Sequence, residues 1–231
     1  LPATDERPAC AAQFEGDALG ILEQAVAQLA PGFHDHAAVP PPRDLTGTRT
    51  VISTDAFQGT GTVRVAVTDT TGAMLDVVDI NLTALGAPTV GGVISAINTG
   101  LAGFATASIT TDGVLKITAT SAANGVAIND IGSAESVTGR GLSHYFGLID
   151  LFVGNDASAL AVKSDLVSQP SRIATAQLST TAVVGDSAVG IGDNRNVKAL
   201  AALSATRFSF SAVGGLGAQQ SSLGDYAAMI I

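Results

Sequence analysis

The segment GLSHYFGLIDLF, residues 141–152, carries the residue types of a hydrolytic site. A serine nucleophile needs a histidine base, and the histidine needs a carboxylate to orient it. Ser143, His144 and Asp150 supply these types. Their arrangement argues against this chemistry, because neighbouring side chains on an extended segment point apart. The segment also lacks the Gly-x-Ser-x-Gly spacing of a nucleophile elbow. We therefore expect no catalytic residue here.

The apolar residues of the same segment favour a packing role instead. We expect five of them to dock the segment on the hydrophobic core: Tyr145, Phe146, Leu148, Leu151 and Phe152. His144 would then make a structural hydrogen bond or face solvent.

Metal-ligating residue types are sparse elsewhere in the chain. His34 and His36 flank Asp35, but alternate residues on a loop do not converge by themselves, and no third ligand is identifiable. We expect this cluster to be a solvated loop. Cys10 is the only cysteine, which excludes an intrachain disulfide and a thiolate zinc site. With no base nearby, it is interpreted as an incidental thiol, and we expect no metal.

Glycines and aspartates give no cofactor signal either. The stretch GDSAVGIGDNRN, residues 185–196, is rich in glycine but has no phosphate-loop lysine and no dinucleotide fingerprint. Four aspartates fit no calcium-loop spacing, and we expect most of them in turns or on solvated faces. They are Asp55, Asp69, Asp76 and Asp79. The sequence thus predicts no cofactor and no enzymatic activity.

Residues 61–130 have the periodicity of a small α+β module. Apolar residues alternate in VRVAV (63–67) and VDINL (78–82), which predicts two half-buried strands joined by a turn at DTTG. An apolar stripe at helical spacing then follows Thr89, whose side chain is a suitable N-cap. The stretch from 105 to 121 predicts a hairpin that turns at Asp112-Gly113. The order is strand, strand, helix, strand, strand.

The flanking regions predict helices and extended segments. One apolar stripe at helical spacing comprises Leu19, Leu22, Val26 and Leu29. Pro170 predicts a break in SQPSR, and two further helices are expected after Asp193 or Asn194 and after Ser222. We therefore predict an elongated, mainly β protein of the α+β class. Residues 61–130 would form an inserted module, and residues 1–60 and 131–231 a helix-containing core domain.

Composition excludes several classes of partner. The 231 residues include 11 basic and 20 acidic ones, for a net charge of -9, and no basic cluster is present. Nucleic acids and anionic membranes both require such a cluster, so neither is expected as a partner. No apolar run is long enough for an ordinary membrane span, and LPATDERPAC does not read as a signal peptide. Because the sequence begins with Leu1 and not with an initiator Met, we expect it to be a fragment of a longer protein.

Two Ile-Asn pairs introduce a family resemblance. The run VDINLTALGAPTVGGVISAINTG (78–100) resembles a short module of flagellins and hook-associated proteins, in which a strand with Ile-Asn precedes a helix ending in Ile-Asn. The pairs here are Ile80-Asn81 and Ile97-Asn98.

The C-terminal third resembles one family more specifically. GLSHYFGLIDLF, SQPSRIATAQLS (168–179), GDNRNVKALAAL (192–203) and SLGDYAAMI (222–230) follow in the order typical of the flagellar hook-associated protein 1 family. The resemblance covers about residues 61–231 and implies a core fragment without the terminal helices of that family.

The resemblance implies a structural role in the junction between the flagellar hook and filament, outside the cell. It implies export by the flagellar type III apparatus with a chaperone. The implied partners are hook protein, a second junction protein and copies of the chain in a ring. We expect the fragment alone to be a soluble monomer.

Other functions are compatible with parts of the sequence. Flagellin or the filament cap could carry the same module. A secreted β-rich carbohydrate-binding or adhesive module would need a patch of aromatic residues, which make up only 4% of this chain. A hydrolase would require Ser143, His144 or His36 to converge with an acid in one cleft.

Overall fold

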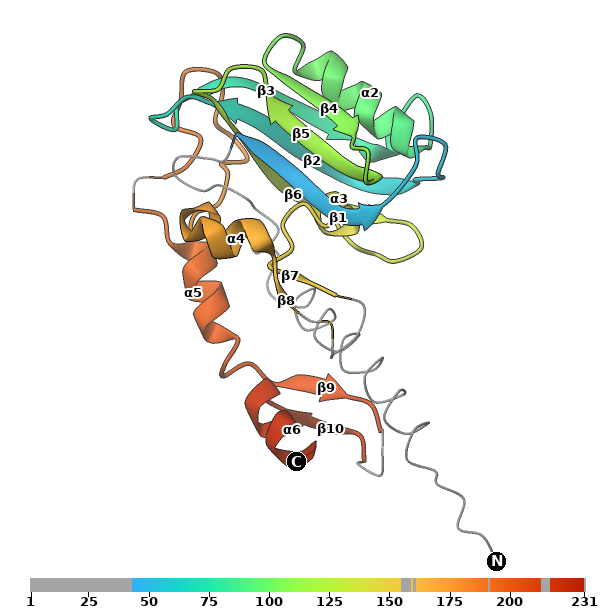
Figure 1. Ribbon diagram of the computed structural model, residues 1–231, viewed down its shortest axis with the longest axis vertical. Helices are drawn as coiled ribbons and strands as arrows, with labels where there is room; N and C mark the ends of the chain where they lie inside the picture. Colours follow the sequence, from blue (N-terminus) through green and yellow to red (C-terminus); the bar gives the residue numbers. More distant parts are fainter. Residues whose placement is uncertain (1–42, 155–158, 160, 191, 213–216, 231) are drawn as a thin grey trace, which may run out of the picture.

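The computed structural model describes residues 43–154, 159, 161–190, 192–212 and 217–230. The protein belongs to the α+β class and is mainly β, as its sequence predicts. Figure 1 shows the large module at one end of the molecule and a small unit of two strands and a helix at the other. The predicted helix around Leu19, together with Cys10 and the His34 cluster, lies outside the described residues.

Two antiparallel sheets build the module. One has the order β3-β2-β6, formed by β2 (Gly59–Thr68), β3 (Met74–Asn81) and β6 (Gly125–Glu135). The other has the order β1-β5-β4, formed by β1 (Asp44–Thr50), β4 (Ala105–Ile109) and β5 (Val114–Ala119). The helix α2 (Val90–Gly100) packs against β3 and β4, so one helix covers the module (Figure 1).

The local signals in the sequence produce this order. The side chain of Thr89 accepts a hydrogen bond from the Gly92 backbone N at 3.1 Å, which confirms the predicted N-cap of α2. Gly113 has φ +78°, a left-handed conformation that glycine adopts without a steric penalty. The Thr110 N donates to Val114 O at 2.9 Å and closes the hairpin between β4 and β5. The predicted order of strand, strand, helix, strand, strand is confirmed.

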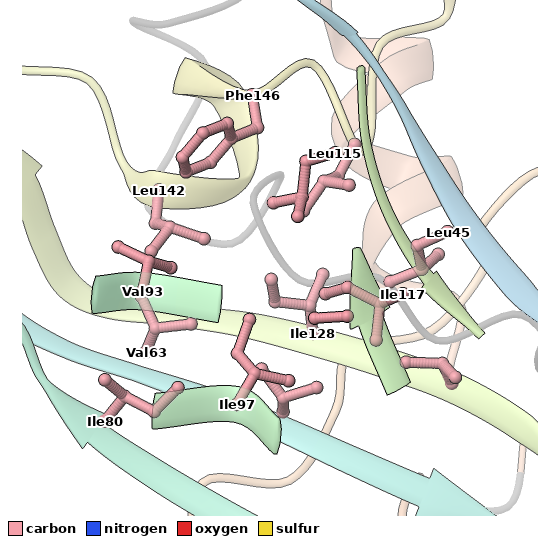
Figure 2. Packing of buried hydrophobic residues seen from close by; sticks show 14 of the residues in the cluster. Leu45, Val63, Ile80, Val93, Ile97, Leu115, Ile117, Ile128, Leu142 and Phe146 are labelled. Atoms are coloured by element: carbon pink, nitrogen blue, oxygen red, sulfur yellow. The ribbon is translucent and has the colours of Figure 1, made fainter. Parts of the chain in front are cut away.

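A single hydrophobic core joins the sheets, α2 and the short helix α3 (Leu142–Tyr145). Figure 2 shows side chains from all of these elements meeting in the core. Those labelled are Leu45, Val63, Ile80, Val93, Ile97, Leu115, Ile117, Ile128, Leu142 and Phe146. Burying such side chains stabilises the fold by roughly 1.5–3 kcal/mol each.

The predicted module spans residues 61–130, and the sheets of the structure also include residues on both sides of that range. β1 pairs with β5 in register from Asp44 opposite Thr118, and α3 packs on β6. The sheets and their core therefore extend over residues 44–148. The division into an inserted module and a core domain stays a prediction.

A second apolar cluster covers the other face of the β3-β2-β6 sheet. Its members come from the strands and from residues 176–189: Ala66, Met74, Ala127, Ala176, Leu178, Ala182, Ala188 and Val189. β2 is therefore buried on both faces, whereas its alternating pattern predicts a strand with one solvated face.

The rest of the described chain consists of short elements. They are η1 (Leu82–Ala84), β7 (Phe152–Val153), β8 (Ala161–Val162), α4 (Ser164–Ser168), η2 (Pro170–Arg172), α5 (Arg195–Ala202), β9 (Phe208–Phe210), β10 (Gln219–Ser221) and α6 (Leu223–Ile230). Pro170 opens η2 directly after α4, which confirms the predicted break. Ser222 accepts a hydrogen bond from Asp225 N at 3.1 Å and caps α6 as predicted. The rings of Phe210 and Tyr226 stack at 3.8 Å and hold α6 on the β9-β10 hairpin.

Candidate functional site

Ser143 lies in a closed polar site at the start of α3. Its side chain is fully buried, and its hydroxyl donates to Asp130 Oδ2. The backbone N of Ser143 donates to the same oxygen at 3.1 Å, and Ser133 Oγ donates to Asp130 Oδ1 at 2.8 Å. The Asp130 carboxylate thus accepts the N–H of Ser143, while Ser133 Oγ accepts the N–H of Leu142 at 3.0 Å, so both first N–H groups of α3 have partners. A nucleophilic serine would instead face a histidine base.

His144 and Asp150 do come together, although nothing in their spacing predicts it. His144 Nδ1 lies 3.7 Å from Asp150 Oδ1, and Thr48 Oγ1 donates to Asp150 Oδ2 at 2.6 Å. The chain reverses between them at Gly147, whose φ is +67°. His144 is 9% exposed, so it does not face solvent. Ser143 and His144 therefore contact different carboxylates, and the three residues do not form a catalytic triad.

The aromatic residues of this segment confirm most of the expected packing. The rings of Tyr145 and Phe146 lie 5.0 Å apart, and each also contacts Phe57, at 5.1 and 5.5 Å. Leu148 is buried as well. The prediction is wrong for Phe152, which is 41% exposed on the two-stranded β7-β8 ribbon.

A group of charged side chains lies beside the edge of β1. We call it the charged cluster, and it comprises Asp44, Lys116, Asp150, Lys163, Asp165 and Arg172. Asp44 is its centre: Lys116 Nζ lies 2.8 Å from Oδ2, and Arg172 Nη2 lies 2.8 Å from Oδ1. Lys163 Nζ donates to the carbonyl oxygen of Thr46 at 2.6 Å.

Burial and neighbouring charges shift the pKa of Asp44 and of Lys163. Burial by itself raises the pKa of Asp44, but the hydrogen bond and charge of Lys116 and the charge of Arg172 outweigh it, so this pKa lies below its usual value. Burial lowers the pKa of Lys163, and the charges of Asp165 and Asp150 oppose that effect only in part.

The cleft beside the charged cluster is small. Its volume is about 20 Å³, room for roughly one water molecule, whereas small-molecule sites span roughly 300–1,000 Å³. Its apolar lining includes Leu45, Leu148 and Ile173. Chemically, this arrangement cross-links β1, β5 and residues 163–172 through charge.

A second buried charge lies on β2, where the alternating pattern predicts a solvated side chain. Arg64 is 8% exposed and forms a bidentate ion pair with Asp79, in which both N–O distances are 2.7 Å. Its Nη1 also donates to the carbonyls of Ser179 and Ala182, each at 3.1 Å. The hydrogen bond that Arg64 donates to Asp79 raises the pKa of Arg64. The hairpin register places Arg64 opposite Asp79. The opposite charges of these two cross-strand positions were the sequence signal that could have predicted the ion pair.

Of the four aspartates expected in turns or on solvated faces, Asp69 and Asp55 accept hydrogen bonds from nearby backbone N–H groups. Asp69 Oδ1 accepts from Thr71 N and Ala73 N in the DTTG turn, at 2.8 and 3.0 Å. Asp55 accepts from Ile52 N at 2.9 Å. Among the residues that the structure describes, no group of three or more His, Cys, Asp or Glu side chains is arranged to hold a metal ion.

The asparagines of the two Ile-Asn pairs have defined structural roles. Asn81 Oδ1 accepts from Thr83 N at 3.0 Å and starts η1 after β3. Asn98 Nδ2 donates to Ala107 O at 3.0 Å, and its Oδ1 accepts from Ala107 N at 2.7 Å. Ile80 and Ile97 lie in the core directly before them. Each pair therefore combines a core contact with a hydrogen bond that organises the next segment.

No helix within the described ranges is both long and apolar enough to cross a membrane. No family model matches the chain, and no curated protein is significantly similar to it.

Proposed function

We propose that this chain is a structural part of the bacterial flagellum and forms the outer body of a subunit at the junction between hook and filament. The observation that carries the proposal is the pair of Ile-Asn motifs, which join β3, α2 and β4 in the order of the flagellar module. The four C-terminal motifs, in the order of the hook-associated protein 1 family, favour the junction over flagellin and the filament cap.

The packing of the motif residues supports a mechanical role. Ile80 and Ile97 are buried in one core, and Asn98 ties α2 to the backbone of β4. Ser143 contacts Asp130 and His144 lies beside Asp150, so the residue types that could support hydrolysis serve local structure. A subunit of this kind would act by packing against its neighbours and would perform no chemistry.

The partners of such a subunit are hook protein, a second junction protein and further copies of the chain. Export through the flagellar type III apparatus, with a chaperone, would deliver it outside the cell. Val197 of α5, which is 43% exposed, is one position available for contacts in an assembly.

Deletion of the source gene tests the proposal. We expect bare hooks by electron microscopy and flagellin lost to the medium, with filaments recovered when purified full-length protein is added. Normal filaments on the deletion strain would overturn the proposal. A strain whose protein lacks residues 44–148 distinguishes an adhesive role from a role in filament assembly. If filaments form but surface attachment is lost, the module has a binding role of its own.

A further inference from the structure

We propose that residues 163–172 form a strap, held on the edge of β1 by charge and released when salt screens that charge. This inference does not depend on the flagellar proposal.

The contacts between the strap and β1 are polar and involve both ends of the strap. Lys163 Nζ donates to Thr46 O at 2.6 Å. Arg172 Nη2 donates to Asp44 O at 2.9 Å and lies 2.8 Å from Asp44 Oδ1. Within the strap, Arg172 Nη1 lies 3.8 Å from Asp165 Oδ2. The side chains of Lys163 and Arg172 therefore hold the strap on β1.

The two carbonyls that these cations bind lie on an edge strand. β1 is the outer strand of the β1-β5-β4 sheet and pairs with β5 on its other side. The outward carbonyls of an edge strand have no partner within the sheet and can accept hydrogen bonds from another chain. The side chains of Lys163 and Arg172 occupy these acceptors in place of a strand.

Apolar packing of the strap is limited: Leu166 is half-buried and lines the small cleft with Leu45 and Leu148. No residue of α4 or η2 is buried, and Val167 is 66% exposed. The chain is anchored in the protein interior on either side of the strap, by Leu148 before it and Ala176 after it, which are 3% and 1% exposed. The strap can therefore lift from β1 as a loop while the core remains folded. Partly exposed ion pairs weaken as ionic strength rises, so salt opens the strap.

Trypsin provides a direct test, because it cleaves after Lys163 and Arg172, the residues whose side chains are held in the closed strap. The purified chain is digested at sodium chloride concentrations from about 0.05 M to about 1 M, which shortens the screening length from more than 10 Å to about 3 Å. Mass spectrometry gives the cleavage rate after each residue. Cleavage after Arg207, an exposed residue outside the strap, corrects for the effect of salt on trypsin itself.

We expect cleavage after Lys163 and Arg172, relative to Arg207, to rise roughly tenfold across this range, because cleavage follows the open population when opening is fast. Amide exchange in β2 should stay unchanged and show that the core is intact. A cleavage ratio that does not change with salt would overturn the proposal, as would loss of β2 protection in parallel with strap cleavage.

The variant Asp44→Asn removes the shared carboxylate charge and leaves both trypsin sites in place. We expect faster strap cleavage at low salt and a smaller effect of salt, because the ion pair with Arg172 is lost while the hydrogen bonds to the carbonyls of Thr46 and Asp44 remain. The matched control is Asp112→Asn, on the exposed hairpin turn, which should behave like the unmodified chain. Equal cleavage of the two variants at low salt would contradict the proposal. If Asp44→Asn fails to fold, the salt series on the unmodified chain still decides the question.

Discussion

The side-chain amide of Asn98 forms two hydrogen bonds with the backbone of Ala107, donating to its carbonyl at 3.0 Å and accepting from its N–H at 2.7 Å. β4 is the outer strand of its sheet, so Asn98 occupies backbone groups that no strand pairs with. One side chain of α2 thus fixes the helix on the sheet and closes part of the sheet edge.

Replacing this amide tests both effects. Asn98→Ala leaves a donor and an acceptor of Ala107 without their partner, and we expect a loss of about 2 kcal/mol in the free energy of unfolding, measured with urea. The open edge should also produce association that increases with protein concentration in sedimentation experiments. Ser95→Ala, on the exposed face of the same helix, is the control and should change neither property. Equal stability of the two variants would contradict the role of Asn98.

Arg64 should contribute more to stability than an exposed cation. Arg64→Met removes the ion pair with Asp79 and the hydrogen bonds to the carbonyls of Ser179 and Ala182. We expect a loss of about 2–3 kcal/mol in the free energy of unfolding, below that of a fully buried pair because the side chain of Asp79 is 46% exposed. Lys198→Met, at an exposed position of α5, should cost less than about 0.5 kcal/mol. Thermal unfolding followed by circular dichroism would show whether the two variants differ.

Phe146 should be a main anchor of segment 141–152. Phe146→Ala removes a fully buried ring that contacts Phe57 and Tyr145, and we expect a loss of about 3–5 kcal/mol. Phe152→Ala, in the same segment, removes a partly exposed ring and should cost about 1 kcal/mol or less. The comparison uses urea unfolding followed by tyrosine fluorescence. Similar losses in the two variants would show that packing in this segment is not centred on Phe146.

The carboxyl of Asp193 should make stability depend on acid pH. The hydrogen bond from Arg195 lowers the pKa of Asp193 from 3.8 to about 2, aided by the backbone N–H groups of Arg195 and Gln177. A lowered pKa in the folded state contributes stability above the unfolded value of 3.8, and this contribution is lost as pH falls through about 2.

We therefore compare Asp193→Asn with the unmodified chain by urea unfolding across acid pH. The variant should be less stable by about 1–2 kcal/mol near neutral pH, a value reduced because Arg195 is exposed to solvent. The difference should shrink as pH falls from about 4 to about 2. Asp112→Asn serves as the control at an exposed carboxylate. A difference that stays constant over this pH range would contradict the assignment.

Local signals predicted much of the fold correctly. The N-cap at Thr89, the turn at Asp112-Gly113, the break at Pro170 and the cap at Ser222 all depend on contacts within a few residues. Such contacts are encoded in short stretches of sequence. The N-terminus of α5 was predicted in part: Asn194 occupies the cap position without a side-chain bond, while Asp193 accepts from Arg195 N at 3.1 Å.

Long-range pairing was not predictable in the same way. β1 was missed because its partner, β5, lies more than sixty residues later in the chain. The first six residues of β6 are buried without alternation, because both faces of its sheet are covered, so the period of a half-buried strand is absent. Residues 176–189, which cover one of these faces, carry no strong periodic signal.

The sequence by itself determined the class of the fold, the order of the central elements and the turns and caps that delimit them, because each depends on near neighbours along the chain. Only the tertiary structure decided which polar residues meet. It separates Ser143 from His144 by directing them to Asp130 and Asp150, it buries Arg64 beneath residues 179–182, and it joins Lys163 and Arg172 to β1. The physical reason is that an ion pair or hydrogen bond requires proximity in space. These residues, several of them more than a hundred positions apart, acquire that proximity only when the whole chain has folded.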